Sequence, residues 1–235
     1  MHDVVKLASS ILALEHITMK RIQNSLVISA VAATLLASAA AYSAESANDI
    51  KQRIGRGDPA TGKIRSQFCQ GCHGEVGLSV EDLIPNLGGQ YAQYIAKQLH
   101  NFQSGARKHQ IMSAVSRTVN DTEMADIAAY FASQNKMHGN GSGNNPVGKN
   151  LFLKGDAGRN IPPCMSCHGE NGKGLAPNNA TNPVIGGQRK SYLRAQLQHW
   201  RSGERSNSPG GVMNKVAKTL TDAEIEALTD YLSGL

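Results

Sequence analysis

The sequence contains the pattern Cys-x-x-Cys-His twice, at residues 69–73 and 164–168, and all 4 of its cysteines belong to these two patterns. Two thiols at this spacing can form thioether bonds with the two vinyl groups of one porphyrin, and the adjoining histidine then reaches the iron as its proximal ligand. The pattern therefore predicts two covalently attached heme c groups. The residues expected to hold them are Cys69, Cys72 and His73 for one heme, and Cys164, Cys167 and His168 for the other.

Two CxxC pairs could also form a structural zinc site, or each pair could act as a thioredoxin-like dithiol. Neither kind of site requires a histidine directly after both pairs. Heme attachment also consumes the thiols, which an oxidising compartment would otherwise pair as disulfides. Heme is therefore favoured over both alternatives.

The two patterns belong to an internal duplication that covers most of the chain. The segments FCQGCHGE (68–75) and PCMSCHGE (163–170) correspond at an offset of 95, and two P-x-x-GGQ segments (85–90 and 183–188) correspond at an offset of 98. A Gly/Asn/Ser run at 138–146 separates the copies and is typical of a flexible linker. We predict two domains, residues 45–141 and 142–235, each small enough that a bound cofactor would supplement its core.

Within each copy the apolar residues follow helical spacing. One helix is expected from Gln90 to Gly105, with its counterpart ending at Gly203. A second helix in each copy begins with a capping-box pattern, Asn120-x-x-Glu123 or Thr221-x-x-Glu224. No alternating strand pattern competes. The expected fold is all-α, with two tandem helical domains each built around one heme.

The sixth iron ligands can be sought by elimination. The second copy contains only two methionines, Met165 inside the attachment turn and Met213, and the repeat partner of Met213 is Met112. Histidines at 100, 109, 138 and 199 are rival ligands, but none has a histidine at its repeat-equivalent position. We therefore expect Met112 and Met213 opposite the proximal histidines. Compared with ligation by two histidines, a histidine–methionine pair raises the reduction potential of the heme. It also occupies the position where oxygen or peroxide would bind, which indicates an electron carrier rather than an enzyme.

Further residues could contact the hemes indirectly. Pro85 and Pro183 are placed to accept a hydrogen bond from the proximal histidine through their carbonyls, although each could equally start a turn before Gly-Gly. Arg107 and Arg205 follow a helix end and could pair with heme propionates. Exposed arginines are nevertheless commoner than bound ones.

The N-terminus has the form of a secretory signal peptide. Met19, Lys20 and Arg21 precede an apolar run and then small residues, so we expect residues 1–44 to be removed; an uncleaved membrane anchor is the alternative. Without them the chain keeps 21 basic and 16 acidic residues, a net charge of +5. The basic residues are scattered and no nucleic-acid motif is present. We interpret them as surface charge for docking protein partners.

The ordered set of these features, in duplicate, resembles the diheme cytochrome c4 family. It includes the two CxxCHG units, the P-x-x-GGQ segments, two Y-x-x-x-QL-x-x-[FW]-x-SG-x-R helices and a late methionine before a capped helix. The resemblance implies class I cytochrome c domains related by a pseudo-twofold axis, a periplasmic location, and the proline carbonyl role. It also implies quinol-cytochrome c oxidoreductase as electron donor and a terminal oxidase or other reductase as acceptor. Peripheral association with the membrane is compatible with these partners.

Two alternatives from other classes stay open. One is the cytochrome subunit of an enzyme complex, such as a sulfide-oxidising flavocytochrome. The other is a catalytic diheme enzyme, which would need a displaceable or unusual ligand at one iron. The duplicated methionine counts against the second.

Overall fold

The structure is a computed structural model that describes residues 57–175 and 182–235. The signal peptide predicted at residues 1–44 lies outside the described residues. The described residues form helices, and their one β-type pairing is an isolated bridge between Asp156 and Ile161. The all-α prediction is confirmed. None of the helices in the described part of the chain is long and apolar enough to cross a membrane.

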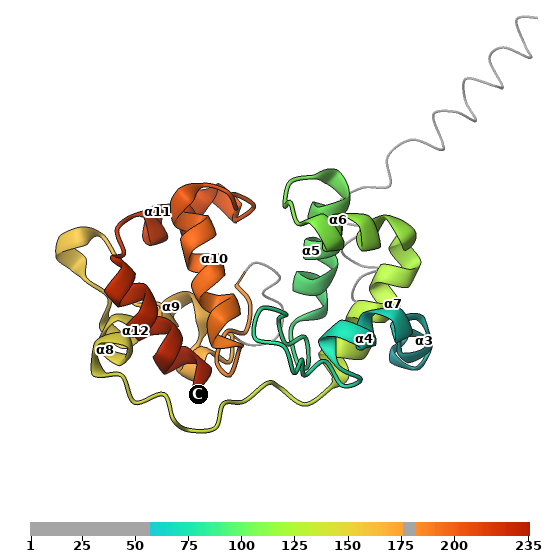
Figure 1. Cartoon of the computed structure of the whole chain (residues 1–235), viewed down its shortest axis with the longest axis horizontal. Coiled ribbons are helices and arrows are strands. Elements are labelled where there is room, and N and C mark those ends of the chain that lie inside the picture. Colours follow the sequence, from blue (N-terminus) through green and yellow to red (C-terminus); the bar gives the residue numbers. More distant parts are fainter. Residues whose placement is uncertain (1–56, 176–181) are drawn as a thin grey trace, which may run out of the picture. The chain divides into compact units, whose positions relative to one another are not determined.

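The helices occur in the same order in the two copies of the repeat, here named the first half (57–141) and the second half (142–235) (Figure 1). The first half contains α3 (Pro59–Arg65), α4 (Gln67–His73), α5 (Ala92–Ser104), α6 (Gln110–Val115) and α7 (Asp121–Ser133), with a 3-10 turn at Ser116–Thr118. The second half contains α8 (Pro146–Lys154), α9 (Met165–His168), α10 (Lys190–Ser202), α11 (Val212–Lys218) and α12 (Asp222–Ser233), with 3-10 turns at Ala157–Arg159, Glu170–Gly172 and Pro209–Gly211.

Local signals in the sequence set the ends of the longer helices. Both predicted capping boxes are present: Asn120 caps α7 with Glu123, and Thr221 caps α12 with Glu224. Helix α5 is terminated by its C-cap residue, Gly105, whose backbone is left-handed with a φ of 77°. The predicted helix boundaries are therefore confirmed to within two residues at these ends.

The first helix of each half lies directly against the last one, and a glycine makes this contact possible. A Cβ added to Gly62 of α3 would lie 2.0 Å from the carbonyl oxygen of Asp126 in α7, and one added to Gly148 of α8 would lie 2.0 Å from that of Ala227 in α12. Any larger side chain would push the backbones apart. The apolar core of each half is built around this crossing, with Phe131 and Phe152 fully buried.

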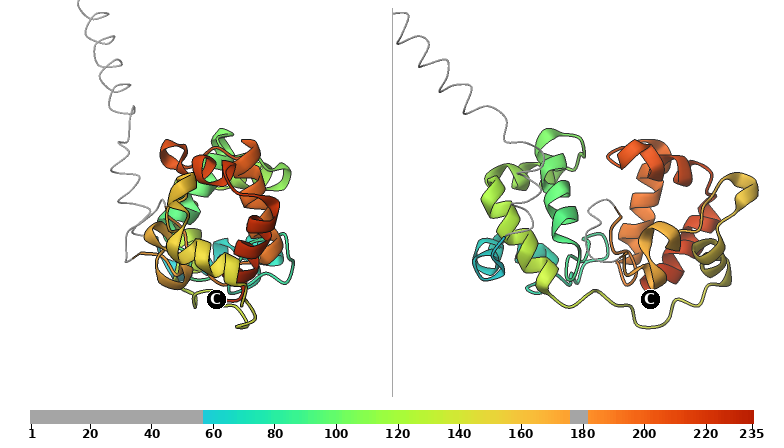
Figure 2. Two further views of the ribbon diagram at one scale, coloured as in Figure 1. Left: turned by 90° about the vertical axis from the view of Figure 1, so that its left-hand side faces the viewer. Right: turned by 180° about the vertical axis from the view of Figure 1, so that it is seen from behind.

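The segment between the halves differs from the flexible linker that its composition predicted. Gly139 N donates to Leu235 O at 2.5 Å, and Gly141 N donates to Gly234 O at 3.0 Å. A Cβ on Gly139 or Gly143 would overlap backbone atoms at the end of α12. The glycines therefore let this segment pack against the last helix, and their backbone N–H groups satisfy carbonyls that a helix end leaves free. Figure 2 shows this segment from two further directions.

Candidate functional site

Each CxxCH histidine ends a short helix and is fixed by a proline carbonyl. His73 Nδ1 lies 2.9 Å from Pro85 O, and His168 Nδ1 lies 2.9 Å from Pro183 O. The two histidines are 7% and 8% exposed. When Nδ1–H donates to the carbonyl, the ring orientation is fixed and Nε2 is the nitrogen left to bind a metal.

Burial favours the neutral form of both histidines. It lowers the pKa of His73 and of His168, while the hydrogen bond to the proline carbonyl acts in the opposite direction. Burial also raises the pKa of the Cys69 thiol, and it raises that of Cys164 to about 11. All four cysteines are free of disulfides.

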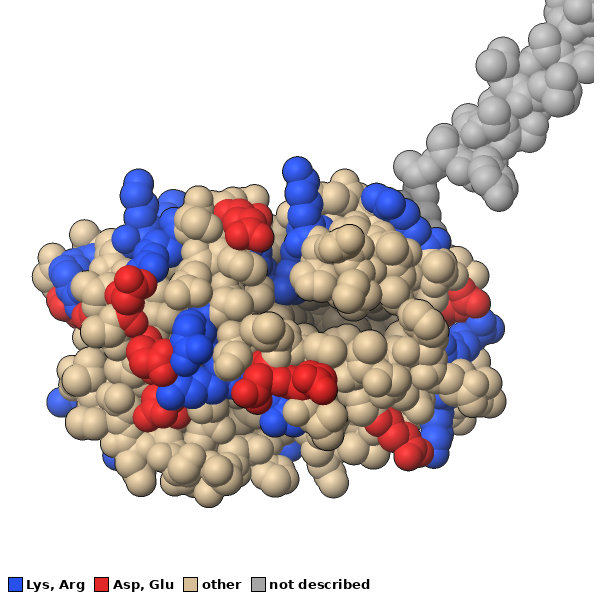
Figure 3. Space-filling model, viewed as in Figure 1, with Lys and Arg blue, Asp and Glu red and all other residues tan. Residues whose placement is uncertain are grey.

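These residues fit a covalently held heme better than a zinc ion. No group of three or more His, Cys, Asp or Glu side chains in residues 57–175 and 182–235 is arranged to hold a metal ion, so the cysteines do not form a joint zinc site. Cys69 and Cys164 instead pack at the edge of the apolar core of their own half. Figure 3 shows a hollow in the surface of the half that carries α5, α6 and α7. A buried histidine and a thiol beside an apolar core in each half, with a hollow in the first half, suit a covalently attached porphyrin.

The two methionines expected as sixth ligands occupy equivalent helices. Met112 lies in α6 and Met213 in α11, and both side chains are half-buried. The backbone N–H of each is held by a side chain from before its helix: Met112 N donates to His109 Nδ1 at 3.3 Å, and Met213 N donates to Ser208 Oγ at 3.2 Å. Their role as iron ligands remains a proposal. Of the other methionines in the described residues, Met124 and Met137 are fully buried.

Arg107 and Arg205 reach across to the opposite half. Arg107 Nη2 donates to Tyr192 Oη at 3.1 Å, and its guanidinium carbon lies 4.7 Å from the centre of the Phe102 ring. Arg205 Nη2 donates to Tyr94 Oη at 3.0 Å, and Arg205 is only 6% exposed. The guanidinium carbon of Arg205 lies 4.3 Å from the centre of the Trp200 ring, so each arginine stacks on an aromatic ring of its own half and is held by a tyrosine of the other half.

A second set of contacts between the halves involves two glutamines that sequence reasoning did not assign. Gln188 binds the backbone of Asn86. The N–H of Asn86 donates to Gln188 Oε1 at 2.8 Å, and Gln188 Nε2 donates to the carbonyl of Asn86 at 3.0 Å. Gln90 binds the backbone of Val184 in the same two ways, at 3.0 Å and 2.8 Å. We call these glutamine contacts and the arginine–tyrosine contacts together the seam. The repeated GGQ tripeptide was the signal that could have predicted it.

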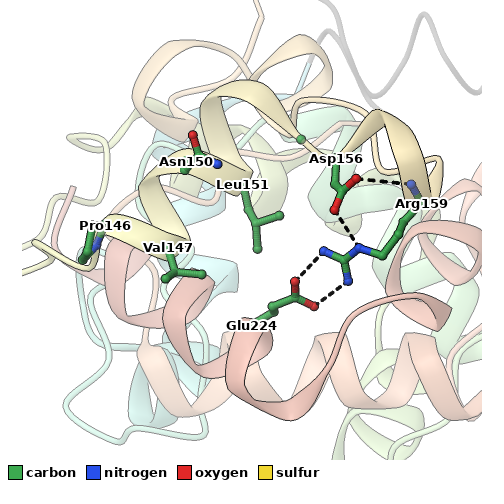
Figure 4. A pocket seen from close by; sticks show the side chains of 8 residues that line it. Pro146, Val147, Asn150, Leu151, Asp156, Arg159 and Glu224 are labelled. Carbon is green, nitrogen blue, oxygen red and sulfur yellow. Dashed lines mark hydrogen bonds and ion pairs between the residues drawn. The ribbon is translucent and has the colours of Figure 1, made fainter.

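One pocket among the described residues, in the second half, is not a heme site. It has a volume of about 360 Å³ and lies between α8 and the start of α12. Figure 4 shows Arg159 in it, bonded to both Asp156 and Glu224. No residue of either CxxCH pattern lines this pocket. Its features are those of an ion-pair network that supports the second half.

Comparisons with known proteins agree with this geometry. A family model described as cytochrome c matches residues 60–135 and again residues 148–235. Cytochrome c4 of Pseudomonas aeruginosa is 36% identical over 76% of this chain and 89% of its own length. A "thiosulfate dehydrogenase electron acceptor" of Stutzerimonas stutzeri is also 36% identical, over 71% of this chain and 78% of its own length. The crystal structure of reduced cytochrome c4 from Pseudomonas stutzeri has a TM-score of 0.71 at 34% identity, covering 76% of this chain and 99% of that one.

The sequence likeness covers both halves, and the shared structure includes two cytochrome c domains in tandem. The two CxxCH patterns supply the attachment points for two covalently bound heme c groups. The chain thus belongs to the diheme cytochrome c4 family of electron-transfer proteins.

Proposed function

We propose that this cytochrome works in the periplasm and carries electrons from a quinol-cytochrome c oxidoreductase to a terminal oxidase or another reductase. The observation that carries the proposal is the duplication of a histidine and a methionine that could close each iron site. Both halves have a proline-fixed histidine, and both place a methionine in the first turn of a short helix, α6 or α11. A closed site at both irons leaves no position for a substrate.

The chain's own residues would hold and tune the two groups. Cys69, Cys72, Cys164 and Cys167 provide thioether links, His73 and His168 the proximal ligands, and Met112 and Met213 the distal ligands. When bound, each heme supplies one-electron chemistry between its ferrous and ferric states. The carbonyls of Pro85 and Pro183 keep the imidazole planes fixed, which limits rearrangement when the charge on the iron changes. Arg107 and Arg205 supply positive charge for propionates.

The surfaces of the halves suit different partners. Residues 57–141 contain seven basic and seven acidic residues, whereas residues 142–235 contain eleven basic and seven acidic residues. The first half also exposes large apolar side chains, including Phe68 at 77% and Ile111 at 62%. A basic second half favours an acidic partner, and a neutral first half with apolar contacts suits another surface. One half could therefore accept electrons while the other donates them.

A second candidate function is acceptance of electrons from a thiosulfate-oxidising enzyme. Two relatives, from Stutzerimonas stutzeri and Thiomonas intermedia, carry the name "thiosulfate dehydrogenase electron acceptor" at 36% and 33% identity. A thiosulfate dehydrogenase from Marichromatium purpuratum matches with a TM-score of 0.67, with this chain covering 40% of that longer chain. The donor would then be the enzyme, while the two heme sites would work in the same way.

The two candidates can be separated with the purified diheme protein. Its ferric spectrum should be low-spin and show the weak red charge-transfer band of methionine-ligated iron for both hemes. Its reduction should then be timed with quinol plus quinol-cytochrome c oxidoreductase, and separately with thiosulfate plus thiosulfate dehydrogenase. Faster reduction by the quinol system supports the respiratory role, and faster reduction by the thiosulfate system supports the second. A high-spin heme, or tight cyanide binding at one iron, would contradict both and favour a catalytic enzyme.

A further inference from the structure

Three cationic side chains meet at the seam without a carboxylate. Arg107, Arg205 and Lys97 contribute the positive charges, and their recorded hydrogen-bond partners are hydroxyl, amide and backbone oxygens. No ion pair with an acidic residue is recorded for any of the three in the described part of the chain. Partly buried cations without a counter-charge are costly, so this cluster calls for an anion.

Several hydrogen-bond donors around these cations also have no recorded acceptor. Gln98 is 7% exposed, and its Oε1 accepts from Arg107 at 2.8 Å and from Arg205 at 3.2 Å. Its Nε2 is buried and has no partner among the described residues. The hydroxyls of Tyr94 and Tyr192 accept from the arginines, and no acceptor for their own protons is recorded there. A carboxylate would satisfy these donors, and the heme propionates are carboxylates that the proposed function brings to Arg107 and Arg205.

Lys97 breaks the symmetry of this cluster. Arg107 and Arg205 correspond at the repeat offset of 98, but the residue that corresponds to Lys97 is Ala195. Lys97 projects from α5 of the first half, yet its Nζ donates to Asn207 O of the second half at 2.9 Å. Burial lowers the pKa of Lys97, and the neighbouring charges of Arg205 and then Arg107 lower it further. An extra positive charge therefore lies at the seam, on the side of Arg205.

We propose that Lys97 makes the two hemes inequivalent, because its ammonium group raises the reduction potential of the second half's heme more than that of the first. A positive charge disfavours the ferric state, which has one more positive charge than the ferrous state, and this effect decreases with distance and with solvent screening. The Nζ contact with Asn207 and the proximity to Arg205 place the charge beside the second half. This inference rests on the proposed function, in which Arg205 faces the propionates of that heme.

The test is a spectroelectrochemical titration of the holoprotein and its Lys97→Met variant, which keeps the aliphatic stem and removes the charge. Each potential is assigned to its heme from NMR signals of the axial methionines. We expect both potentials to fall, with the larger fall at the heme of the second half. Lys97→Arg keeps the charge and should retain the wild-type difference between the potentials. Lys108→Met removes an equal charge from an exposed side chain and should shift both potentials little.

The reciprocal variant tests the same idea without removing any native contact. Ala195→Lys places an ammonium at the repeat-equivalent position, so the potential of the first half's heme should rise more than that of the second. The inference is overturned if Lys97→Met leaves the potentials unchanged, shifts them equally, or shifts the first heme more. It is equally overturned if Ala195→Lys raises the second heme more. Failure of the proposed function would be seen separately, as a wild-type spectrum without two low-spin, methionine-ligated hemes.

Discussion

Each CxxCH histidine is oriented by a backbone carbonyl rather than by another side chain. The carbonyls of Pro85 and Pro183 accept from His73 and His168, and proline has no backbone N–H of its own to compete for a partner. A backbone acceptor cannot be removed by mutation of its side chain. The proximal geometry therefore tolerates substitution, and the adjustable part of each site is the methionine proposed as the distal ligand.

Replacing one methionine should change one heme. In Met112→His or Met213→His a nitrogen ligand takes the place of a thioether, which favours the ferric iron and lowers the potential of the heme in the altered half. The red charge-transfer band should lose about half of its intensity in each variant, because one of two such sites remains. Redox titration and absorption spectra check this. A variant that leaves both potentials and the band unchanged would show that its methionine is not a ligand.

Glu224 is one carboxylate that links the stability of the second half to pH. Arg159 bonds Glu224 at 2.5 Å and lowers its pKa from 4.5 to about 2. A carboxyl group whose pKa is lower in the folded state stabilises the fold above its unfolded pKa, and this contribution is lost as the pH falls from about 4.5 to about 2. Glu224→Gln should therefore cost about 1 kcal/mol near neutral pH and almost nothing near pH 2.

Glu226 provides a matched comparison for this prediction. Its pKa is also lowered to about 2, by Arg194 first and Lys190 second, but its side chain is 47% exposed while that of Glu224 is 16% exposed. Solvent and salt screen an exposed pair more strongly, so Glu226→Gln should cost less than Glu224→Gln in urea unfolding at 0.15 M salt. Equal losses, or a Glu224→Gln effect that does not depend on pH, would contradict the assignment.

Among the helices, the tightest requirement is the glycine at each crossing. Gly62→Ala should force α3 away from α7, because its Cβ would meet a carbonyl oxygen at 2.0 Å. We expect a loss of about 1–3 kcal/mol in the unfolding free energy. Gly71→Ala is the control, since a Cβ there meets nothing within 4 Å and alanine favours the helix α4. Thermal unfolding of the holoproteins compares them, and equal stability of the two variants would refute the prediction.

Structural features were predictable from the sequence where the residues that cause them are close together in the chain. The capping boxes at Asn120 and Thr221 and the end of α5 at Gly105 follow from residues within one helical turn, and these features were predictable. The linker was misread because its glycines are needed by the end of α12, nearly 100 residues away, which composition does not reveal. The seam contacts of Gln90 and Gln188 were missed for the same reason. Their partners become neighbours only after both halves fold.

For the whole molecule, the two halves fold as separate cores joined by a polar seam. The core of the first half is formed around Phe131 and that of the second around Phe152, and each core includes a cysteine of its own CxxCH pattern. Contacts across the seam are hydrogen bonds to buried amides and arginines. Loss of one heme should therefore affect mainly the half that holds it.

A variant unable to attach the first heme tests this independence. Cys69→Ala with Cys72→Ala should abolish the cooperative unfolding transition of the first half, because a domain of this size needs the porphyrin to complete its core. The second half should still bind one heme and unfold cooperatively. Calorimetry and the heme content of the purified variant measure both effects. Native-like transitions for both halves would show that the first core does not need its heme.

Each glutamine of the seam binds a backbone N–H and C=O pair of the opposite half, and Gln188 Nε2 also contacts the sulfur of Met137 at 3.4 Å. Asn86 and Val184 are repeat partners with unrelated side chains, yet both present the same N–H and C=O pair to a glutamine. The paired backbone hydrogen bonds do not depend on which side chain residue 86 or 184 carries. After duplication of an ancestral domain, substitutions at positions 86 and 184 would therefore leave these hydrogen bonds in place. The two copies of the domain could in this way have specialised for different partners while keeping the glutamine-to-backbone hydrogen bonds that join them.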